Sequence, residues 1–378
     1  MSNDNSEDSS NNIVQTDKPY VGAVRIEDVL IDIQALVEKY MSLPKGSSVT
    51  MALWIAGTYV YDDFLIFPKL SIISPEKRCG KTTLLEIIDA LACKSLLASN
   101  ITPAAIFRVI DIYSPTLIID EADTFISGRN DEMIGIINSG HRRASARVIR
   151  ATGDSHMPKS FSTWSPMALA AIKRLPSTVE DRSIVIQLER KTVADRVHRM
   201  PIDLKDRCKH VREKLVAWAN EFEVKQVSPP TISNDRAMDN WSPLFSIAHS
   251  AGWIDKVKTS FMLLNKETDE QTPSIMLLSD IRDIFEKESW LKISSAELTD
   301  KLVVLEERPW CEWKRGQPMT QNSLSKMLGA FNIKSKQIRS THDNSKVVRG
   351  FDVEQFADGF NRYLPEKLLQ SATTLQTR

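Results

Sequence analysis

The sequence predicts an α/β protein whose large first unit is built on a five-stranded parallel sheet. Short apolar runs alternate with helical patterns over residues 70–188, the first run leads into a Gly-Lys-Thr loop, and the third ends in an acidic pair. Strands that alternate with helices are typical of a parallel sheet covered on both faces. Helices and a small C-terminal unit should follow the sheet.

Composition limits the class of protein. The 378 residues are 42% hydrophobic and 26% charged, which is ordinary for a globular protein and leaves room for two or three compact units. Lys plus Arg and Asp plus Glu both number 49, so no overall field attracts the chain to DNA or to an acidic membrane. Any contact with nucleic acid must come from local patches.

The cysteines and the N-terminus indicate the compartment. Four scattered cysteines without a CxxC pair argue against structural zinc and against a disulfide framework. No stretch approaches the roughly 20 apolar residues of a membrane span, and the acidic, polar N-terminus is unlike a secretory signal. We expect a cytoplasmic protein with no membrane partner.

The N-terminal part combines a tail and two helices. Residues 1–22 are rich in Ser, Asn and Asp and should form a disordered acidic tail. Apolar positions at helical spacing predict helices over 26–43 and 48–62, within a helical segment 23–66. The aromatic side chains of the second helix are expected to belong to the core rather than to a ligand platform.

A phosphate-binding loop follows the first strand, residues 70–74. The loop fits the pattern for such loops except that Pro75 replaces the first glycine. Gly80 would allow close backbone approach, Lys81 would reach the β- and γ-phosphates of ATP, and the Thr82 hydroxyl would hold Mg²⁺. The alternative is a chance Gly-Lys-Thr at a helix start. The candidate cofactor-binding residues of the loop are Pro75, Glu76, Lys77, Arg78, Cys79, Gly80, Lys81, Thr82 and Thr83.

A second element, which is acidic, supports the prediction that the loop binds phosphate. After a strand at 95–99 and a helix at 102–112, the apolar strand 116–120 ends in Asp120 and Glu121. Ligands of open parallel sheets bind at the carboxyl ends of the strands. Asp120 is the expected Mg²⁺ ligand and Glu121 the group that activates the attacking water. An acidic turn after a core strand is the alternative, which the upstream loop makes less attractive.

A basic excursion precedes the fourth strand. Strand-like residues 144–152 and 159–164 flank Gly153-Asp154, which predicts a hairpin. Its arginines could contact a nucleic-acid backbone, or they could form an ordinary solvated face. The candidate residues are Arg142, Arg143, Arg147 and Arg150. Strands 166–172 and 183–188 complete the sheet, and helices at 202–222, 237–251 and 257–264 are expected to form a lid over the nucleotide.

Longer stretches carry a resemblance to a known family. They are FPKLSIISPEKRCGKTTLLE, NITPAAIFRVI, LIIDEAD, INSGHRR, FSTWSPMALAAI, LPSTVEDRSIVIQLERK, DRAMDNWSPLFSIAHSAG, SDIRDIFE and WCEWKRGQPMT. Together they resemble phage-, prophage- and plasmid-borne P-loop ATPases described as DNA primase/helicase-type proteins, whose C-terminal half is catalogued as a domain of unknown function. The five strands, with the metal acid on the third and a hairpin before the fourth, look like an AAA+ core.

The resemblance implies three further roles. Arg182 matches the arginine finger that a neighbouring AAA+ subunit inserts, Lys173 matches the sensor of the γ-phosphate, and Arg236 is positioned like a lid-domain sensor. The alternatives are a local ion pair of Arg182 with Asp181, a solvated Lys173, and a packing role for Arg236 in the lid.

The C-terminal residues predict a winged helix. Helices at 275–286, 294–305 and 320–331 precede strand-like segments 336–340 and 346–351 with Asp343-Asn344 as the turn, and a closing helix follows at 353–363. Such domains place the third helix in a DNA groove and the wing on the backbone; a protein-interaction module is the alternative. The basic residues concerned are Lys326, Lys334, Lys336, Arg339, Lys346 and Arg349.

The leading expectation is an AAA+-like motor or remodeller that hydrolyses Mg²⁺-ATP as a homo-oligomeric ring and acts on single-stranded or forked DNA. Helicase activity is implied by the resemblance, and a separate primase or other replication or defence partner would supply further activities. The alternative is a nucleotide-gated switch, such as an initiator, loader or phage-defence component; a degenerate P-loop scaffold is a third. The expected domains are 1–22 (tail), 23–66 (helices), 67–192 (ATPase core), 193–270 (lid), 271–365 (winged helix) and 366–378 (flexible tail).

Overall fold

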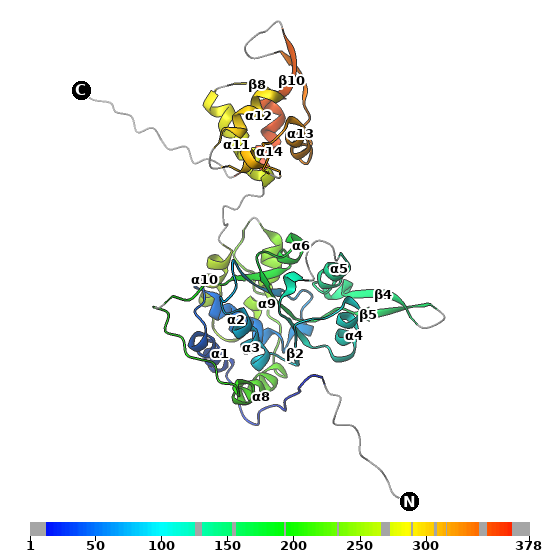
Figure 1. The fold of residues 1–378 in the computed structure, drawn as a ribbon. Coiled ribbons are helices and arrows are strands. Elements are labelled where there is room, and N and C mark those ends of the chain that lie inside the picture. The colour runs from blue at the N-terminus through cyan, green and yellow to red at the C-terminus, as the bar shows by residue number, and fades with distance from the viewer. Residues whose placement is uncertain are drawn as a thin grey trace, which may run out of the picture. The chain divides into compact units, whose positions relative to one another are not determined.

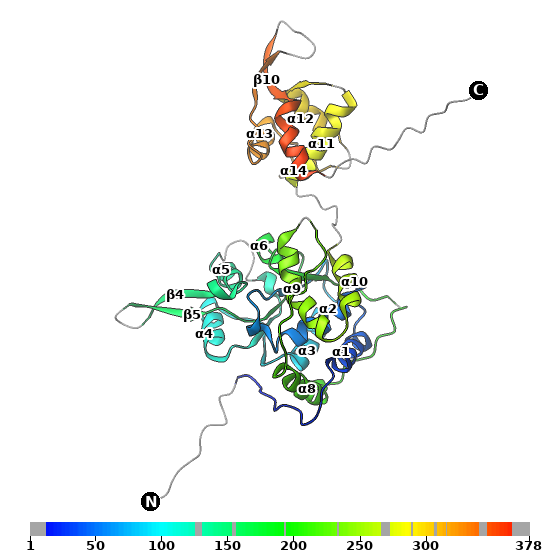
Figure 2. The same cartoon turned by 180° about the vertical axis from the view of Figure 1, so that it is seen from behind.

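The computed structural model describes residues 13–124, 131–152, 156–192, 194–232, 234–265, 273–288, 290–305, 308–314, 316–339 and 346–364. The chain divides into two units, Met1–Lys266 and Glu267–Arg378, and each has a hydrophobic core of its own (Figures 1 and 2). None of the helices in these described ranges is long and apolar enough to cross a membrane.

The first unit is built on the parallel sheet that the sequence predicts. Its five strands lie in the order β2-β3-β6-β1-β7, and every neighbouring pair is parallel. Because helices cover both faces, every residue of the central strands β1 and β3 is buried, rather than every second one. The strands are β1 (Lys69–Ser74), β2 (Ser95–Ala98), β3 (Thr116–Ile119), β6 (Met167–Ile172) and β7 (Ser183–Gln187).

Two helical layers enclose this sheet. One hydrophobic cluster joins α1, α2, α3, α8, α9 and α10 to one face, and a second joins α4, α5 and α6 to the other. Along β3, Ile118 belongs to the first cluster whereas Leu117 and Ile119 belong to the second. The helices are α1 (Ile26–Tyr40), α2 (Ser47–Gly57), α3 (Lys81–Leu91), α4 (Pro103–Tyr113), α5 (Asp131–Ser139), α6 (Ser177–Glu180), α7 (Leu204–Arg207), α8 (Lys209–Ala219), α9 (Asp235–Ser250) and α10 (Ile254–Leu264).

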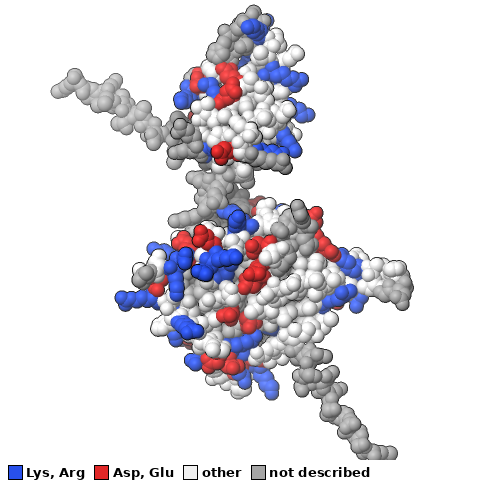
Figure 3. All heavy atoms as spheres, in the orientation of Figure 1, with Lys and Arg blue, Asp and Glu red and all other residues white. Residues whose placement is uncertain are grey.

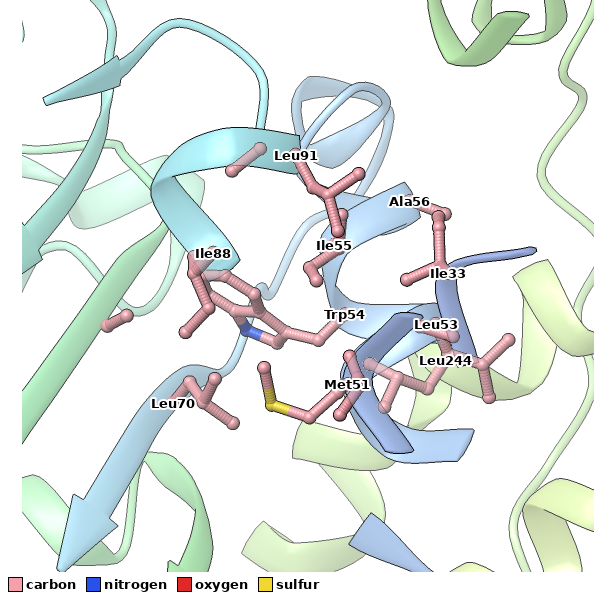
Figure 4. Packing of buried hydrophobic residues seen from close by; sticks show 14 of the residues in the cluster. Ile33, Met51, Leu53, Trp54, Ile55, Ala56, Leu70, Ile88, Leu91 and Leu244 are labelled. Carbon is pink, nitrogen blue, oxygen red and sulfur yellow. The ribbon is translucent and has the colours of Figure 1, made fainter. Parts of the chain in front are cut away.

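Trp54 of α2 anchors the first of these layers. Its side chain is fully buried, and Figure 4 shows it between Leu70 of β1 and Ile88 of α3. The indole Nε1 donates a hydrogen bond to the carbonyl of Pro68 at 2.9 Å, so the buried polar atom is satisfied. The aromatic helix is therefore core, as expected, and it fixes the strand and the helix on either side of the Gly-Lys-Thr loop.

The predicted disordered tail is wrong for its last ten residues, 13–22. Val14 is buried, and the Asp17 carboxylate lies 2.7 Å from Nε of Arg212, with side chains only 8% and 3% exposed. Arg212 also donates to the Ala90 carbonyl at the end of α3. A buried guanidinium requires an anionic partner, and here the tail supplies it from 195 positions away. Composition cannot reveal such a partner.

A two-stranded hairpin projects from the first unit, as predicted (Figures 1 and 2). Its antiparallel strands are β4 (Arg147–Thr152) and β5 (Met157–Ser162). β4 begins later than the sequence indicated because Arg143–Ser145 forms a 3₁₀ turn. The Gly153-Asp154 tip lies outside the described residues.

The second unit contains the expected helices and strand pair together with one strand that the sequence did not reveal. The additional strand, β8, is only three residues long and pairs antiparallel with β10, giving the order β8-β10-β9. Ser294 caps α12 by accepting a hydrogen bond from the Glu297 N–H at 3.1 Å. The Asp343-Asn344 turn lies outside the described residues. The elements are α11 (Pro273–Glu288), β8 (Lys292–Ser294), α12 (Ser295–Val303), α13 (Gln321–Gly329), β9 (Lys336–Arg339), β10 (Val347–Asp352) and α14 (Ala357–Tyr363).

Candidate functional site

The loop between β1 and α3 is shaped around Gly80. This residue caps α3 with φ of 89°, a left-handed conformation that favours glycine. A Cβ atom added there would also lie 2.9 Å from Cε of Met41. As the N-cap residue, Gly80 has no side chain to cap α3, so the first backbone N–H groups of this helix are available to an anion.

The first two residues of α3 hold the chemistry-bearing side chains. Lys81 Nζ donates to Ser74 Oγ at 2.6 Å, which keeps the ammonium over the end of β1. Thr82 Oγ1 donates to Asp120 Oδ2 at 3.1 Å, and Asp120 Oδ1 accepts from the Glu121 N–H at 2.8 Å. The helix after β1 and the acidic end of β3 are thus brought together at one edge of the sheet.

This hydroxyl and carboxylate form a donor set suited to magnesium. Mg²⁺ prefers oxygen ligands and commonly takes one or two from the protein, completing its shell with water and phosphate. No cluster of three or more His, Cys, Asp or Glu side chains occurs among the described residues. Thr82 and Asp120 are consequently a fitting pair for an ion that also binds a phosphate, and a poor pair for a metal held by protein alone.

Three of the seven non-glycine residues with positive φ in the described part of the chain lie at the same edge. Arg78, Glu121 and Lys173 have φ values of 67°, 52° and 71°. A left-handed conformation costs a non-glycine residue about 1–2 kcal/mol, and such residues cluster at functional sites. Lys173 itself is exposed after β6, and its N–H donates to the Ser74 carbonyl at 2.9 Å, which ties it to the start of the loop.

Lys81, Thr82, Asp120 and Glu121 line a cavity of about 860 Å³, here called the carboxyl-edge cavity, whereas the predicted sensor Lys173 is not among its lining residues. Its volume is in the range of small-molecule sites. Of the predicted loop residues, those from Lys77 to Thr83 line it, whereas Pro75 and Glu76 do not. The remaining wall comes from Asp120, Glu121, Asp123, Ile172, Tyr40, Met41, Ser42, Glu189, Lys191, Val197, His198, Arg199 and Met200.

The outer wall differs from the predicted lid. None of the described residues of α8, α9 and α10 lines the cavity; the segment after β7, residues 189–192 and 194–200 and here called the strap, does so instead. The His198 N–H donates to the Lys39 carbonyl at 2.8 Å, and Ser42 Oγ donates to Asp195 Oδ1 at 2.8 Å. Hydrogen bonds from Thr192 and Ser42 lower the pKa of Asp195.

The strap was missed because its residues carry no motif. α8, α9 and α10 instead share the hydrophobic cluster of α1 and α2, so their apolar faces are already occupied. One signal was available: ligands lie beyond the carboxyl ends of parallel strands, and the strap directly follows the last strand.

Arg182 and Arg236 lie at the opposite, amino edge of the sheet. Arg182 immediately precedes β7, and its carbonyl accepts from the N–H of Lys69 at the start of β1. Its Nη1 donates to the Thr178 carbonyl at 2.6 Å, and Asp181 pairs with Arg236 at 2.7 Å rather than with Arg182. Arg236, which was expected to be a lid-domain sensor, is therefore not among the residues that line the cavity containing the predicted loop. Asn240 Nδ2 donates to the Asp181 carbonyl at 3.1 Å and fixes α9 at this edge.

A small pocket of about 190 Å³, here called the amino-edge pocket, lies among these side chains. The ring of the buried His141 lies 2.8 Å from Asn240 Oδ1, and burial lowers the pKa of His141 to about 4. Lys69 is nearby and fully buried, without a hydrogen-bond partner for Nζ in the described structure. Burial, followed by the charge of Arg182, lowers the pKa of Lys69 to about 7. The lining residues are Asn138, His141, Arg142, Ser145, Arg182 and Arg236.

The arginines predicted to contact nucleic acid from the hairpin are largely engaged within the chain. Arg142 pairs with Asp239 at 2.9 Å, Arg143 with Asp62 at 3.3 Å, and Arg150 with Glu132 at 2.8 Å. Arg147 is exposed. Lys and Arg side chains are visible on the hairpin at the right of Figure 3. Exposed ion pairs of this kind contribute little free energy, so these arginines can exchange their carboxylate partners for another anion. They are nevertheless not unpaired charges.

The six residues of the second unit that were predicted to contact DNA are all exposed, on α13 or on and beside the β9–β10 pair. Lys336 lies 3.7 Å from Asp352, and Arg349 donates to the Ser335 carbonyl at 3.4 Å. The strand pairing places Arg349 opposite Gln337 and Val347 opposite Arg339. The structure thus gathers these residues on one small unit: Lys326, Lys334, Lys336, Arg339, Lys346 and Arg349.

Sequence comparisons find a family match and a curated relative. Residues 187–363 match the family described as a protein of unknown function, DUF3631. An uncharacterized 28.9 kDa protein in the xis 5′ region of Saccharopolyspora erythraea is 30% identical over 162 residues, which are 41% of this chain. The match covers 59% of that relative, so the chain spans less than two thirds of its length.

Solved structures with a similar arrangement have low sequence identity. The apo structure of the NrS-1 C-terminal region is 13% identical, covers 91% of this chain and 78% of the other, and has a TM-score of 0.44. A full-length MCM homolog from Methanopyrus kandleri is 7% identical, covers 67% of this chain and 64% of the other, and has a TM-score of 0.41.

Proposed function

We propose that this chain is a Mg²⁺-dependent ATPase with an AAA+-type P-loop core. The observation that carries the proposal is the 3.1 Å contact between Thr82 Oγ1 and Asp120 Oδ2, beside a lysine that lies at the head of the same helix. The strand order supports it, because the loop-bearing β1 lies between β6 and β7 and the acid-bearing β3 lies on the other side of β6. This is the arrangement expected of an AAA+ core.

The position of each residue at the carboxyl edge determines its proposed role in ATP hydrolysis. The open N-terminus of α3 and the Lys81 ammonium bind the phosphates, with Lys81 Nζ exchanging its hydrogen bond to Ser74 for one to a phosphate oxygen. Thr82 and Asp120 would hold Mg²⁺, which would neutralise charge on the phosphates when bound. Glu121 orients the attacking water and accepts its proton. The exposed Lys173 ammonium senses the γ-phosphate.

DNA is the proposed partner of the second unit. Three helices, a short strand and the antiparallel β9–β10 pair support the proposal of a winged helix, in which the exposed lysines and arginines of α13, β9 and β10 supply phosphate contacts. Together with the ATPase core, this arrangement supports a helicase-type motor or remodeller that assembles as a ring.

A nucleotide-gated switch is the second candidate, and one observation favours it. Arg142, Arg143 and Arg150 already hold carboxylates of their own chain, which reduces the charge that the hairpin offers to a translocating strand. A switch that changes its assembly with ATP, without gripping DNA through this hairpin, fits those contacts.

The test is ATP turnover with and without single-stranded DNA, on the wild type and on Lys81→Ala, with mass measured in parallel. A motor hydrolyses faster with DNA and displaces a labelled strand, whereas a switch assembles with ATP and turns over slowly, whether or not DNA is present. The matched control is Arg207→Ala, which removes an exposed cation paired with nearby Asp203. Absence of hydrolysis and of nucleotide binding in the wild type would rule out both candidates.

A further inference from the structure

The strap adds two cations to the wall of the carboxyl-edge cavity. Lys191 and Arg199 both line the cavity, and both are exposed. Neither side chain has a hydrogen-bond or ion-pair partner among the residues that the structure describes, whereas Arg142 and Arg150 of the hairpin region hold carboxylates. The two strap cations are therefore available to an anion in the cavity without the loss of an ion pair.

Contacts with the end of α1 place Arg199 close to the head of α3. The N–H of the preceding residue, His198, donates to the Lys39 carbonyl at 2.8 Å. Two positions after Lys39, the Cε atom of Met41 lies against Gly80, the residue that caps α3. The end of α1 thus connects the strap to the helix terminus at which phosphates are expected.

A second anchor holds the strap nearer its beginning. Ser42 Oγ donates to Asp195 Oδ1 at 2.8 Å. Asp195 Oδ2 accepts from the N–H of Thr192 at 2.6 Å and from its Oγ1 at 2.9 Å. Lys191 directly precedes this hydrogen-bonded threonine. Because the strap is held at two points, its cations lose less conformational freedom when a ligand binds than those of an untethered segment would.

Neighbouring cations of the strap belong to other surroundings. Arg196 lines a different cavity of about 880 Å³, formed with α1 and α10, and does not line the carboxyl-edge cavity. Arg190 lines neither of these two cavities. Lys191 and Arg199 are therefore distinguished by position from two exposed arginines on the same segment, which provides matched controls.

A nucleotide at the loop needs positive charge from more than one side. Its phosphates carry several negative charges, and arginine binds them through a planar fork of donors whereas lysine acts as a point charge. The sensor Arg236, which was expected to supply such charge, is absent from the cavity lining. The lysines and arginines that do line the cavity are Lys77, Arg78 and Lys81 of the loop and Lys191 and Arg199 of the strap.

We propose that Arg199 and Lys191 bind phosphate groups of the nucleotide held by the loop of the same chain, with Arg199 making the larger contribution. This inference rests on the proposed ATPase function and deepens it. The strap then takes the place that the resemblance implied for Arg236, and the phosphates lie between the head of α3 and the strap. Both residues act within one copy of the chain.

Nucleotide binding tests the proposal. With Mg²⁺ and a fluorescent ATP analogue, Arg199→Ala should weaken binding about tenfold or more, and Lys191→Ala about threefold. Competition with unlabelled ATP, ADP, AMP and adenosine then gives the affinity for each ligand. If the guanidinium binds phosphates, the loss in Arg199→Ala is largest for ATP, and adenosine competes equally well for both proteins.

Control variants separate a phosphate contact from a general effect of charge. Arg196→Ala and Arg190→Ala should each stay within about twofold of the wild type, since exposed charges away from the ligand are screened. Arg199→Lys keeps the charge without the fork and should recover part of the affinity. Because Arg199 is exposed, its removal should leave the urea midpoint of unfolding unchanged.

Mixing variants tests whether the strap acts within its own copy. An equal mixture of Arg199→Ala and Lys81→Ala should be no more active in ATP turnover than the sum of its parts, because each copy lacks one group of its own site. Recovery of turnover in the mixture would contradict the inference, since Arg199 would then serve the nucleotide of a neighbouring copy.

The binding data also decide the remaining outcomes. Unchanged ATP affinity in Arg199→Ala, an equal loss for ATP and adenosine, or an equally large loss in Arg196→Ala would each overturn the inference. If the wild type binds ATP without hydrolysing it, the proposed ATPase function fails, and the affinities of the variants still test the strap. A wild type that binds no nucleotide would exclude both.

Discussion

The two edges of the parallel sheet use polar residues in opposite ways. At the carboxyl edge the side chains are matched with one another, Thr82 with Asp120 and Lys81 with Ser74, in a strained and open loop. At the amino edge cations are crowded together beside a buried Lys69 whose Nζ has no hydrogen-bond partner among the described residues.

This difference indicates what the polar groups of each edge cost in free energy before a ligand binds. A set of paired donors and acceptors exchanges its internal hydrogen bonds for those of a ligand at little cost, so the carboxyl edge is prepared for binding within one chain. At the amino edge Arg182 has only a neutral carbonyl as its printed hydrogen-bond partner, and the buried Lys69 amine has none among the described residues, so the charged forms of these two groups cost free energy. Variants at each edge should therefore fail differently.

Lys81→Ala should have the largest effect. The ammonium is the positive side chain at the head of α3, and its removal should lower ATP turnover by at least about 100-fold and weaken nucleotide binding as well. Steady-state hydrolysis and binding of a fluorescent ATP analogue measure the two quantities. Turnover within a few fold of the wild type would remove the carboxyl edge from the chemistry.

Glu121→Gln should separate binding from hydrolysis at the same edge. A general base contributes about 10²–10⁴-fold, so turnover should fall by about 100-fold or more while nucleotide affinity stays near that of the wild type. The amide keeps the size of the side chain and the left-handed backbone of this residue. Full turnover in this variant would instead favour a scaffold in which the loop serves no catalysis.

Lys69→Met tests how much the buried amine at the amino edge lowers the free energy of unfolding. The pKa of Lys69 falls from 10.5 to about 7 on folding, so between these values the unfolded chain holds a proton that the folded chain lacks. Wild-type stability should therefore rise with pH by up to about 1.4 kcal/mol per unit in this window, and be lowest at and below pH 7.

The methionine variant should lose this slope and be more stable than the wild type, most of all near neutral pH. Urea denaturation of both proteins at several pH values across the window measures the difference. If the free energies of unfolding of the two proteins change with pH in parallel, the buried amine does not carry this cost.

The smallest effect is expected away from both edges, in the second unit. Changing Lys336 and Arg339 to Glu should weaken retention on DNA severalfold and reduce the salt dependence of binding, by about 0.9 in slope for each DNA phosphate that the variant no longer neutralises. Basal ATP hydrolysis should stay unchanged, and Arg207→Ala should alter neither quantity. DNA retention equal to the wild type would exclude these residues from the DNA surface.

The carboxyl edge was largely predictable because its residues form local motifs. Strand, loop and helix are contiguous from Lys69 to Leu91, and Asp120 follows an uninterrupted apolar strand. Hydrophobic periodicity and the loop pattern therefore located the five strands and the loop and acidic parts of the cavity lining. The strap was not predictable, because its position depends on hydrogen bonds to the end of α1 rather than on a pattern of its own.

The sequence by itself determined the parallel sheet, the Gly-Lys-Thr loop at the head of α3 and the acidic end of β3, since each depends on neighbouring residues and on the hydrophobic periodicity of the chain. Only the tertiary structure decided what surrounds the amino edge. His141 meets Asn240 across 99 positions, and Asp181 meets Arg236 across 55. Contacts over such distances depend on where α9 docks against β7, and packing of the whole core determines that position.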